Sequence, residues 1–146
     1  MAETQSFKNH TRWDPVFHFF IAPLLLANII VVGIHIARSH HAFGFHSAWS
    51  ILIAVALLLL ALKARMYALR DQDRIIRLEE RLRLASMIPA EQMAELESLT
   101  MRQYIGLRFA SNPELPALAR RAIREKLTEK QIKEAIVSWR ADNDRV

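Results

Sequence analysis

The chain has 146 residues, of which 52% are hydrophobic and 24% are charged, and its formal net charge is +5. This length accommodates one modest domain or two small ones. The absence of cysteine excludes disulfides, thiolate metal sites and a cysteine nucleophile. Only three glycines, together with abundant Leu, Ala, Arg and Glu, indicate an all-helical protein.

The charged residues are distributed unevenly along the chain. Residues 16–62 contain one basic residue, Arg38, and no acidic residue. Residues 63–146 contain seventeen Lys or Arg and thirteen Asp or Glu, which leaves +4 of the net charge there. We therefore expect residues 16–62 to be embedded in a membrane and residues 63–146 to be exposed to water.

A polar N-terminal segment, residues 1–15, precedes the first apolar run at residues 16–37. This run has no formal charge, and about 20 apolar residues suffice to cross the hydrocarbon core of a bilayer. It is too long for the apolar part of a signal peptide, and the preceding segment has mixed charge. We therefore expect a retained transmembrane helix.

A short external loop, residues 38–47, leads to a second predicted span at residues 48–69. Its fully apolar part is short, but Lys63 and Arg65 can extend their charged ends towards the interface. Trp49 and Tyr67, about 27 Å apart on a helix, are suited to its two interfaces. No Gly or Pro separates this span from the charged helical pattern that follows, so one long helix is predicted to leave the bilayer.

The distribution of basic residues predicts the orientation. Residues 63–83 contain seven Lys or Arg, whereas the loop between the spans contains only Arg38. The positive-inside rule places both termini of this two-span protein in the cytoplasm. Lys63, Arg65 and Arg70 are candidate contacts for anionic lipid headgroups.

Polar residues within the first span are candidate functional residues. They are His18, Asn28 and His35. We expect the histidines to lie at the two interfaces and Asn28 to form a hydrogen bond across a helix pair, within the hairpin or a dimer. Binding of a ligand, metal or haem by these histidines is an alternative, but the second span offers no axial ligand. Histidines 40, 41 and 46 of the loop have no neighbouring carboxylate, so no metal site or cofactor is predicted.

After the second span, residues 70–87 are predicted to form a cytoplasmic stalk helix. Its apolar residues follow the 3-4-3 spacing of a coiled-coil seam over about two heptads. We call these positions the association seam: Ile75, Leu78, Leu82 and Ala85. Asp73 with Arg77, and Glu79 with Arg83, are spaced for ion pairs along the helix. We expect the seam to be covered by the C-terminal helices or by a second copy.

Residues 88–146 are predicted to form a small helical domain, the cap. Pro89 begins a helix, Thr100 and Thr128 each begin another with Gln three residues later as a capping box, and Pro113 precedes a further one. Residues 114–126 and 129–139 have apolar stripes typical of core-facing helices. The stripes of these two helices are Leu115, Leu118, Ala119, Ala122 and Ile123, and Ile132, Ala135, Ile136 and Trp139.

Basic residues of the cap alternate with glutamates, which is typical of a solvated mixed face. They are Arg120, Arg121, Arg124, Lys126, Lys130 and Lys133. Nucleic-acid binding is a weaker alternative, because no recognition-helix pattern of polar base-reading residues is present. No carboxylate is predicted to lie buried beside a histidine, so no catalytic residue is assigned and the chain is predicted not to be an enzyme.

Several sequence blocks resemble an uncharacterised bacterial family of small two-span membrane proteins that carry a domain of unknown function. They are FKNHTRWDPVFHFF at 7–20, DRIIRLEERLRL at 73–84, LRFAS at 107–111 and LTEKQIK at 127–133. The resemblance implies a bacterial inner-membrane protein and supplies no site residues. The main functional hypothesis is a membrane-anchored adaptor or regulatory subunit, with the bilayer and either itself or another protein as partners.

Overall fold

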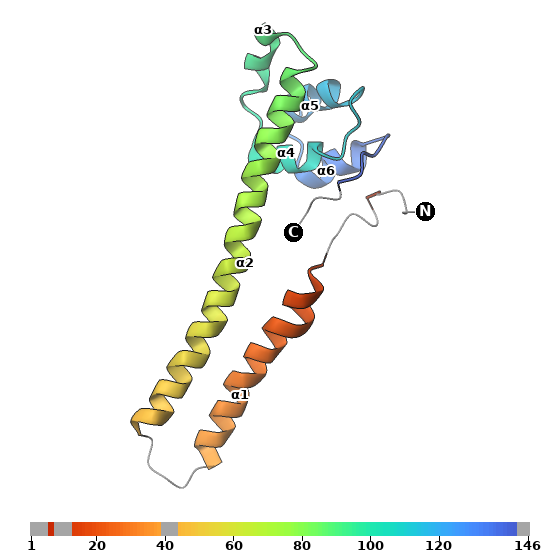
Figure 1. Ribbon diagram of the computed structural model, residues 1–146. Coiled ribbons are helices and arrows are strands. Elements are labelled where there is room, and N and C mark those ends of the chain that lie inside the picture. The colour runs from red at the N-terminus through yellow and green to blue at the C-terminus, as the bar shows by residue number, and fades with distance from the viewer. Residues whose placement is uncertain (1–5, 8–12, 39–43, 143–146) are drawn as a thin grey trace. The chain divides into compact units, whose positions relative to one another are not determined.

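The computed structural model describes residues 6–7, 13–38 and 44–142, and the secondary structure of these residues is helical apart from one isolated bridge (Figure 1). The helices are η1 (Phe17–Ile21, a π-helix), α1 (Ala22–Arg38), α2 (Phe45–Ala85), α3 (Ala90–Met93), η2 (Ala94–Leu96, a 3₁₀ helix), α4 (Met101–Leu107), α5 (Leu115–Arg124) and α6 (Glu129–Ala135). The described residues form two compact units: those within 13–69, and 70–142 together with 6–7. The predicted all-helical class is confirmed.

The beginning of the first apolar helix is fixed by Asp14. Its Oδ1 accepts a hydrogen bond from the backbone N–H of Phe17 at 3.1 Å, which satisfies one of the free donors at a helix start. The wider π-helical turn η1 follows and ends just before Pro23. A wider turn at this place is consistent with proline's lack of an N–H donor and its clash with the preceding turn.

Helix α2 is continuous over 41 residues, which corresponds to about 61 Å. It contains neither Gly nor Pro, so nothing in its sequence interrupts the backbone hydrogen bonds between the apolar and the charged part. It begins three residues before the predicted second span. After Ala85, the backbone N–H groups of Ser86 and Ile88 still donate to Leu82 and Leu84, and Pro89 then excludes further helix.

Within the part of the chain that the structure describes, two helical segments are long and apolar enough to cross a membrane: Phe17–Arg38 and the apolar part of Phe45–Ala85. None of the residues of α1 is buried. Large apolar side chains such as Leu26, Val31 and Leu60 are more than half exposed. Such surfaces require an apolar environment or a partner.

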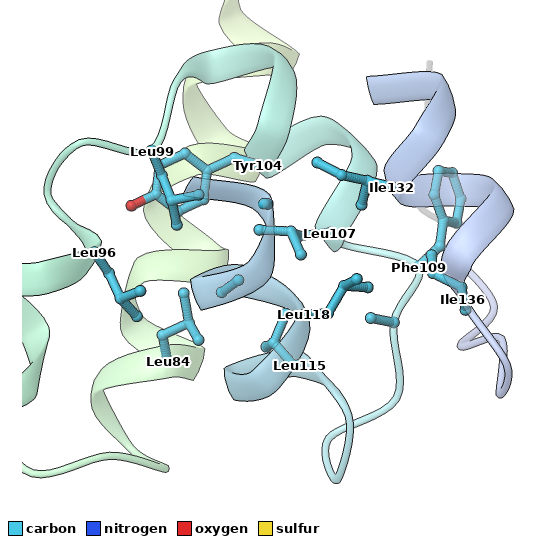
Figure 2. Packing of buried hydrophobic residues seen from close by; sticks show 13 residues of the cluster. Leu84, Leu96, Leu99, Tyr104, Leu107, Phe109, Leu115, Leu118, Ile132 and Ile136 are labelled. Atoms are coloured by element: carbon cyan, nitrogen blue, oxygen red, sulfur yellow. The ribbon is translucent and has the colours of Figure 1, made fainter. Parts of the chain in front are cut away.

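The cap has a hydrophobic core into which α2 contributes one side chain, Leu84 (Figure 2). Leu84 is fully buried, and Ile76 on the same face of α2 is 6% exposed. Around Leu84 lie buried residues from every other element of the cap except the short α3, namely Leu96, Leu99, Tyr104, Leu107, Phe109, Leu115, Leu118, Ile132 and Ile136. Residues 70–85 of α2, the stalk, therefore form part of the cap's own fold.

Both predicted capping boxes are confirmed. The hydroxyls of Thr100 and Thr128 accept from the backbone N–H groups of Gln103 and Gln131, and each glutamine side chain accepts from its threonine N–H in return. The predicted core stripe of α5 is also confirmed, because four of its five residues are buried and Ile123 packs against the core. Lys126 lies two residues after the end of α5. Its φ of 51° is the left-handed conformation that follows many helices.

The prediction that the last helix runs from 129 to 139 is wrong at its end. Helix α6 stops at Ala135, and Ile136 is extended with ψ of 123°. Residues 138–140 instead pair with residues 109–111: Ser111 N–H donates to Ser138 O at 3.1 Å, and Arg140 N–H to Phe109 O at 2.8 Å. Glu114 accepts from the backbone N–H groups of Val137 and Ser138. These contacts are distant in sequence and override the helical pattern, although Trp139 still packs against the core.

Helices α4 and α6 cross closely at Gly106. A Cβ atom at this position would lie 3.1 Å from the backbone oxygen of Glu129 and from Ile132. We expect Gly106→Ala to destabilise the cap by about 1 to 3 kcal/mol, because α6 must move to accept it. Thermal unfolding measures the effect. Gly33→Ala is the matched control, since nothing lies within 4 Å of its Cβ position, and an equal loss there would contradict the packing argument.

Candidate functional site

The junction between stalk and cap contains a cluster of polar groups centred on Arg83, in which Glu80 is buried and Asn112 is exposed. Its side chain is 10% exposed and donates to Asn112 Oδ1 at 2.6 and 2.8 Å, to Ala110 O at 2.6 Å and to Glu80 Oε2 at 3.0 Å. The other oxygen of Glu80 lies 3.5 Å from Arg140. Arg83 therefore ties the stalk to the segment that pairs residues 109–111 with 138–140.

Glu80 is the most deeply buried carboxylate of this junction, with a side chain that is 4% exposed. Burial raises the pKa of Glu80 above its usual value, while the charge and hydrogen bond of Arg83 and the charge of Arg140 oppose this rise. The predicted Glu79–Arg83 pair is wrong, because Arg83 turns towards the cap and pairs with Glu80 instead. Glu79 remains exposed on the neighbouring face.

A second buried polar group, Gln103, joins α4 to the end of α5. Its Nε2 donates to the backbone oxygens of Ala122 at 2.9 Å and Leu127 at 3.2 Å, while its Oε1 completes the capping box of Thr100. The Ala122 oxygen also accepts from the backbone N–H of Leu127, so the amide joins α4 to the turn that follows α5. The capping box was predictable from the sequence, but the two long-range bonds were not.

The basic residues of the cap are largely paired within the cap itself. The ion pairs are Arg120 with Glu95 (3.6 Å), Arg121 and Arg124 with Glu125 (2.9 and 3.3 Å), Lys130 with Glu134 (3.8 Å) and Lys133 with Glu129 (2.6 Å). Hydrogen bonds from Arg121 and then from Arg124 lower the pKa of the exposed Glu125. A continuous positive surface of the kind that binds a phosphate backbone is not formed by these residues.

The association seam is exposed. Ile75, Leu78 and Leu82 are 55%, 59% and 63% exposed, and Ala85 is exposed as well. The cap covers the other side of the stalk, where Ile76, Glu80 and Leu84 are buried. Of the two predicted ways to cover the seam, the C-terminal helices of the same chain are excluded.

The polar residues of the first apolar helix differ in their surroundings. His18 Nδ1 lies 2.8 Å from the carbonyl oxygen of Asp14, so this nitrogen carries the hydrogen and donates. The His18 ring packs edge-on against Trp13, with 4.9 Å between ring centroids. Asn28 and His35 are exposed. The hairpin therefore does not cover Asn28, and a hydrogen-bond partner across a helix pair would have to belong to another chain.

Among the predicted lipid contacts, Arg65 has neighbours within its own unit. Its guanidinium lies 3.6 Å from Asp14 and 5.9 Å from the centre of the Phe17 ring, and its side chain is 14% exposed. Lys63 and Arg70 are exposed. Of the loop histidines, 40 and 41 lie outside the described residues, and His46 is exposed at the start of α2.

Sequence reasoning missed Glu80 entirely, and it missed the tertiary partners of Arg83, Asn112 and Gln103. A charged residue in a helix is normally assigned to the solvent face, and Asn112 was noted only as a helix-start signal. One usable signal was present: Glu80 lies four residues from both Ile76 and Leu84, so it occupies the middle of an apolar stripe. Among the described residues, no group of three or more His, Asp or Glu side chains could hold a metal ion.

The fold and these features define a class: an all-helical protein with two apolar helices that could cross a membrane and a compact helical cap built on the end of the second one. The chain belongs to a family of unknown function, DUF6526, whose family model matches residues 1–146. The predicted resemblance to a family defined by a domain of unknown function is thereby confirmed. No curated protein and no solved structure is significantly similar to the chain.

Proposed function

We propose that this chain is an inner-membrane protein with two spans that acts without catalysis, as an adaptor or regulatory subunit, through its cytoplasmic cap. The observation that carries the proposal is helix α2, whose first part is apolar and exposed and whose last part belongs to the core of a polar, well-packed cap. A lipid bilayer would cover the exposed apolar surface. The cap would then be held on a continuous helix at the membrane surface.

The orientation follows from the basic residues. Seven Lys or Arg in residues 63–83, against Arg38 in the loop, favour a cytoplasmic cap and a cytoplasmic N-terminus. The exposed Lys63 and Arg70 are suited to anionic headgroups at that surface. The ion pairs within the cap argue against nucleic-acid binding, and the hydrogen bond from His18 to Asp14 supports a structural role for this histidine.

The absence of cysteine makes the topology directly testable. We expect Ser47→Cys, near the outer loop, to react with a membrane-impermeant maleimide in intact cells. Ser98→Cys, exposed on the cap, should react only after the cells are lysed. The unmodified chain is the blank. Labelling of Ser98→Cys in intact cells, or release of the chain by alkaline carbonate, would contradict the proposed topology.

The adaptor role is tested by photo-crosslinking in cells. Val137 is 90% exposed, which is unusual for a large apolar residue. A photo-reactive side chain at this position would therefore crosslink to a protein that binds the cap. An adduct with one discrete protein, absent when the probe is at the exposed polar position Glu134, is the expected result. If neither position yields a protein adduct, the adaptor role is wrong.

A further inference from the structure

The association seam lies on the side of the stalk that faces away from the cap. Each residue advances about 100° around an α-helix, so Leu82 and Leu84 point about 200° apart. Leu84 is fully buried in the cap core, and Leu82 is 63% exposed. The same relation holds between Leu78, which is 59% exposed, and Glu80, which is 3% exposed. The stalk therefore has two apolar faces, and its own cap covers one of them.

We propose that a second copy of this chain covers the seam, in a parallel, in-register two-stranded coiled coil formed by the two stalks. In this arrangement Ile75 and Leu82 occupy the a positions, and Leu78 and Ala85 the d positions. Each a and d residue of a parallel pair packs beside its counterpart in the other chain. The cap does not obstruct the pairing, because it lies on the opposite face of the stalk.

The charges beside the seam identify the occupant as a second copy. Arg74 and Arg81 take the g positions on one side of the seam, and Glu79 takes an e position on the other. In a parallel pair, a g residue meets the e residue five positions further along the other chain. Arg74 therefore meets the partner's Glu79, and symmetry repeats this ion pair on the other side. Arg74 and Glu79 are both exposed and so available for this contact.

The antiparallel alternative is disfavoured by the same charges. In an antiparallel pair, g residues face g residues, so Arg74 would lie near the partner's Arg81 and like charges would repel. The parallel arrangement also fits two copies that enter the bilayer with the same orientation, and in this respect the inference rests on the proposed function. Two heptads form a short coiled coil, and confinement in a membrane raises the effective concentration that such a contact needs.

The test uses single cysteines in native membranes. A disulfide most often joins Cα atoms about 5.5 to 6 Å apart, which core positions of a parallel coiled coil can provide for identical residues. We expect Leu78→Cys and Leu82→Cys each to form a homodimeric disulfide on mild oxidation. Arg77→Cys, which is exposed on the same helix but lies outside the seam, should remain monomeric.

The charge pairing is tested by reversal in the Leu78→Cys background. Arg74→Glu alone, or Glu79→Arg alone, places like charges opposite each other and should slow disulfide formation by about fivefold or more. The double variant with both changes restores opposite charges and should recover the original rate. A membrane surface or an unrelated protein in the seam would not produce this recovery, so its absence overturns the inference.

The outcomes separate this inference from the proposed function. If the chain resists carbonate extraction but Leu78→Cys and Leu82→Cys form no homodimer, the dimer is wrong and the membrane proposal stands. A crosslink from these positions to a different protein would likewise mean that the dimer is wrong and that the membrane proposal stands. If the chain is soluble and still forms the homodimer with the predicted charge dependence, the dimer stands and the membrane proposal is wrong.

Discussion

Arg83→Met is expected to lower the free energy of unfolding of the cap by about 3 to 5 kcal/mol. The substitution removes the hydrogen bonds to Asn112, to Ala110 O and to Glu80. Glu80, with a side chain that is 4% exposed, then has a single remaining cation at 3.5 Å, Arg140. Removing one partner of a buried ion pair costs more than removing both, because the remaining charge has lost most of its hydration.

The measurement is equilibrium unfolding followed by Trp139 in a background that carries Trp13→Phe and Trp49→Phe. Trp139 reports on the cap, because its ring lies 5.0 Å from that of the buried Phe109. Arg81→Met is the matched control: the same substitution two residues away at an exposed site should change stability by less than about 0.5 kcal/mol. Equal losses in the two variants would contradict a specific role for Arg83.

The loss caused by Arg83→Met should depend on pH with a defined sign. Burial raises the pKa of Glu80 above 4.5, and Arg83 opposes the rise, so the variant should have a still higher pKa. A raised pKa means that the folded state holds the proton more tightly than the unfolded chain. The cost of ionising Glu80 is therefore absent below pH 4.5 and grows as pH rises through the folded pKa.

The difference in stability between the wild type and Arg83→Met should accordingly be larger at neutral pH than at pH values near 4.5. Adding Glu80→Gln to both chains removes the titrating group and should make the difference nearly independent of pH. If the stability difference between the two chains with Glu80 does not change with pH, the ionised carboxylate of Glu80 is not the cause of the loss in Arg83→Met.

Leu84→Ala is expected to destabilise the cap by about 2 to 5 kcal/mol. Leu84 is fully buried and is the leucine that α2 inserts into the cap core, so its truncation leaves a cavity between the stalk and the short helices (Figure 2). Leu82→Ala is the matched control two residues away. Leu82 is 63% exposed, so its truncation should change the stability of the separated monomer by less than about 0.5 kcal/mol.

The two leucine variants are compared by unfolding of the same Trp139 reporter at detergent dilutions where the chains are separate. In native membranes we expect the opposite order of effects on self-association. Leu82→Ala should weaken self-association, and conservative substitutions on the face of the stalk that the cap covers should leave it intact. A large loss of monomer stability in Leu82→Ala would mean that the cap covers the face we describe as free.

Local patterns in the sequence were sufficient for much of this fold. The helical class, the uninterrupted α2 and the capping boxes at Thr100 and Thr128 each depend on neighbouring residues alone. The core stripe of α5 was also readable, because its apolar residues recur with helical spacing. These features were predictable because the interactions that produce them span no more than four residues, or one helical face.

Tertiary structure decided which face of the stalk the cap covers. From the sequence, Ile75, Leu78 and Leu82 formed the more apolar stripe, whereas the stripe of Ile76 and Leu84 was interrupted by the acidic Glu80. The structure buries the second stripe, because Arg83 pairs with Glu80 and binds Asn112, 29 residues further along the chain. A buried charge is tolerated only where such partners converge, and their convergence is a property of the folded chain. Tertiary contacts also end α6 before its predicted end, because residues 138–140 pair with residues 109–111, which are distant in sequence.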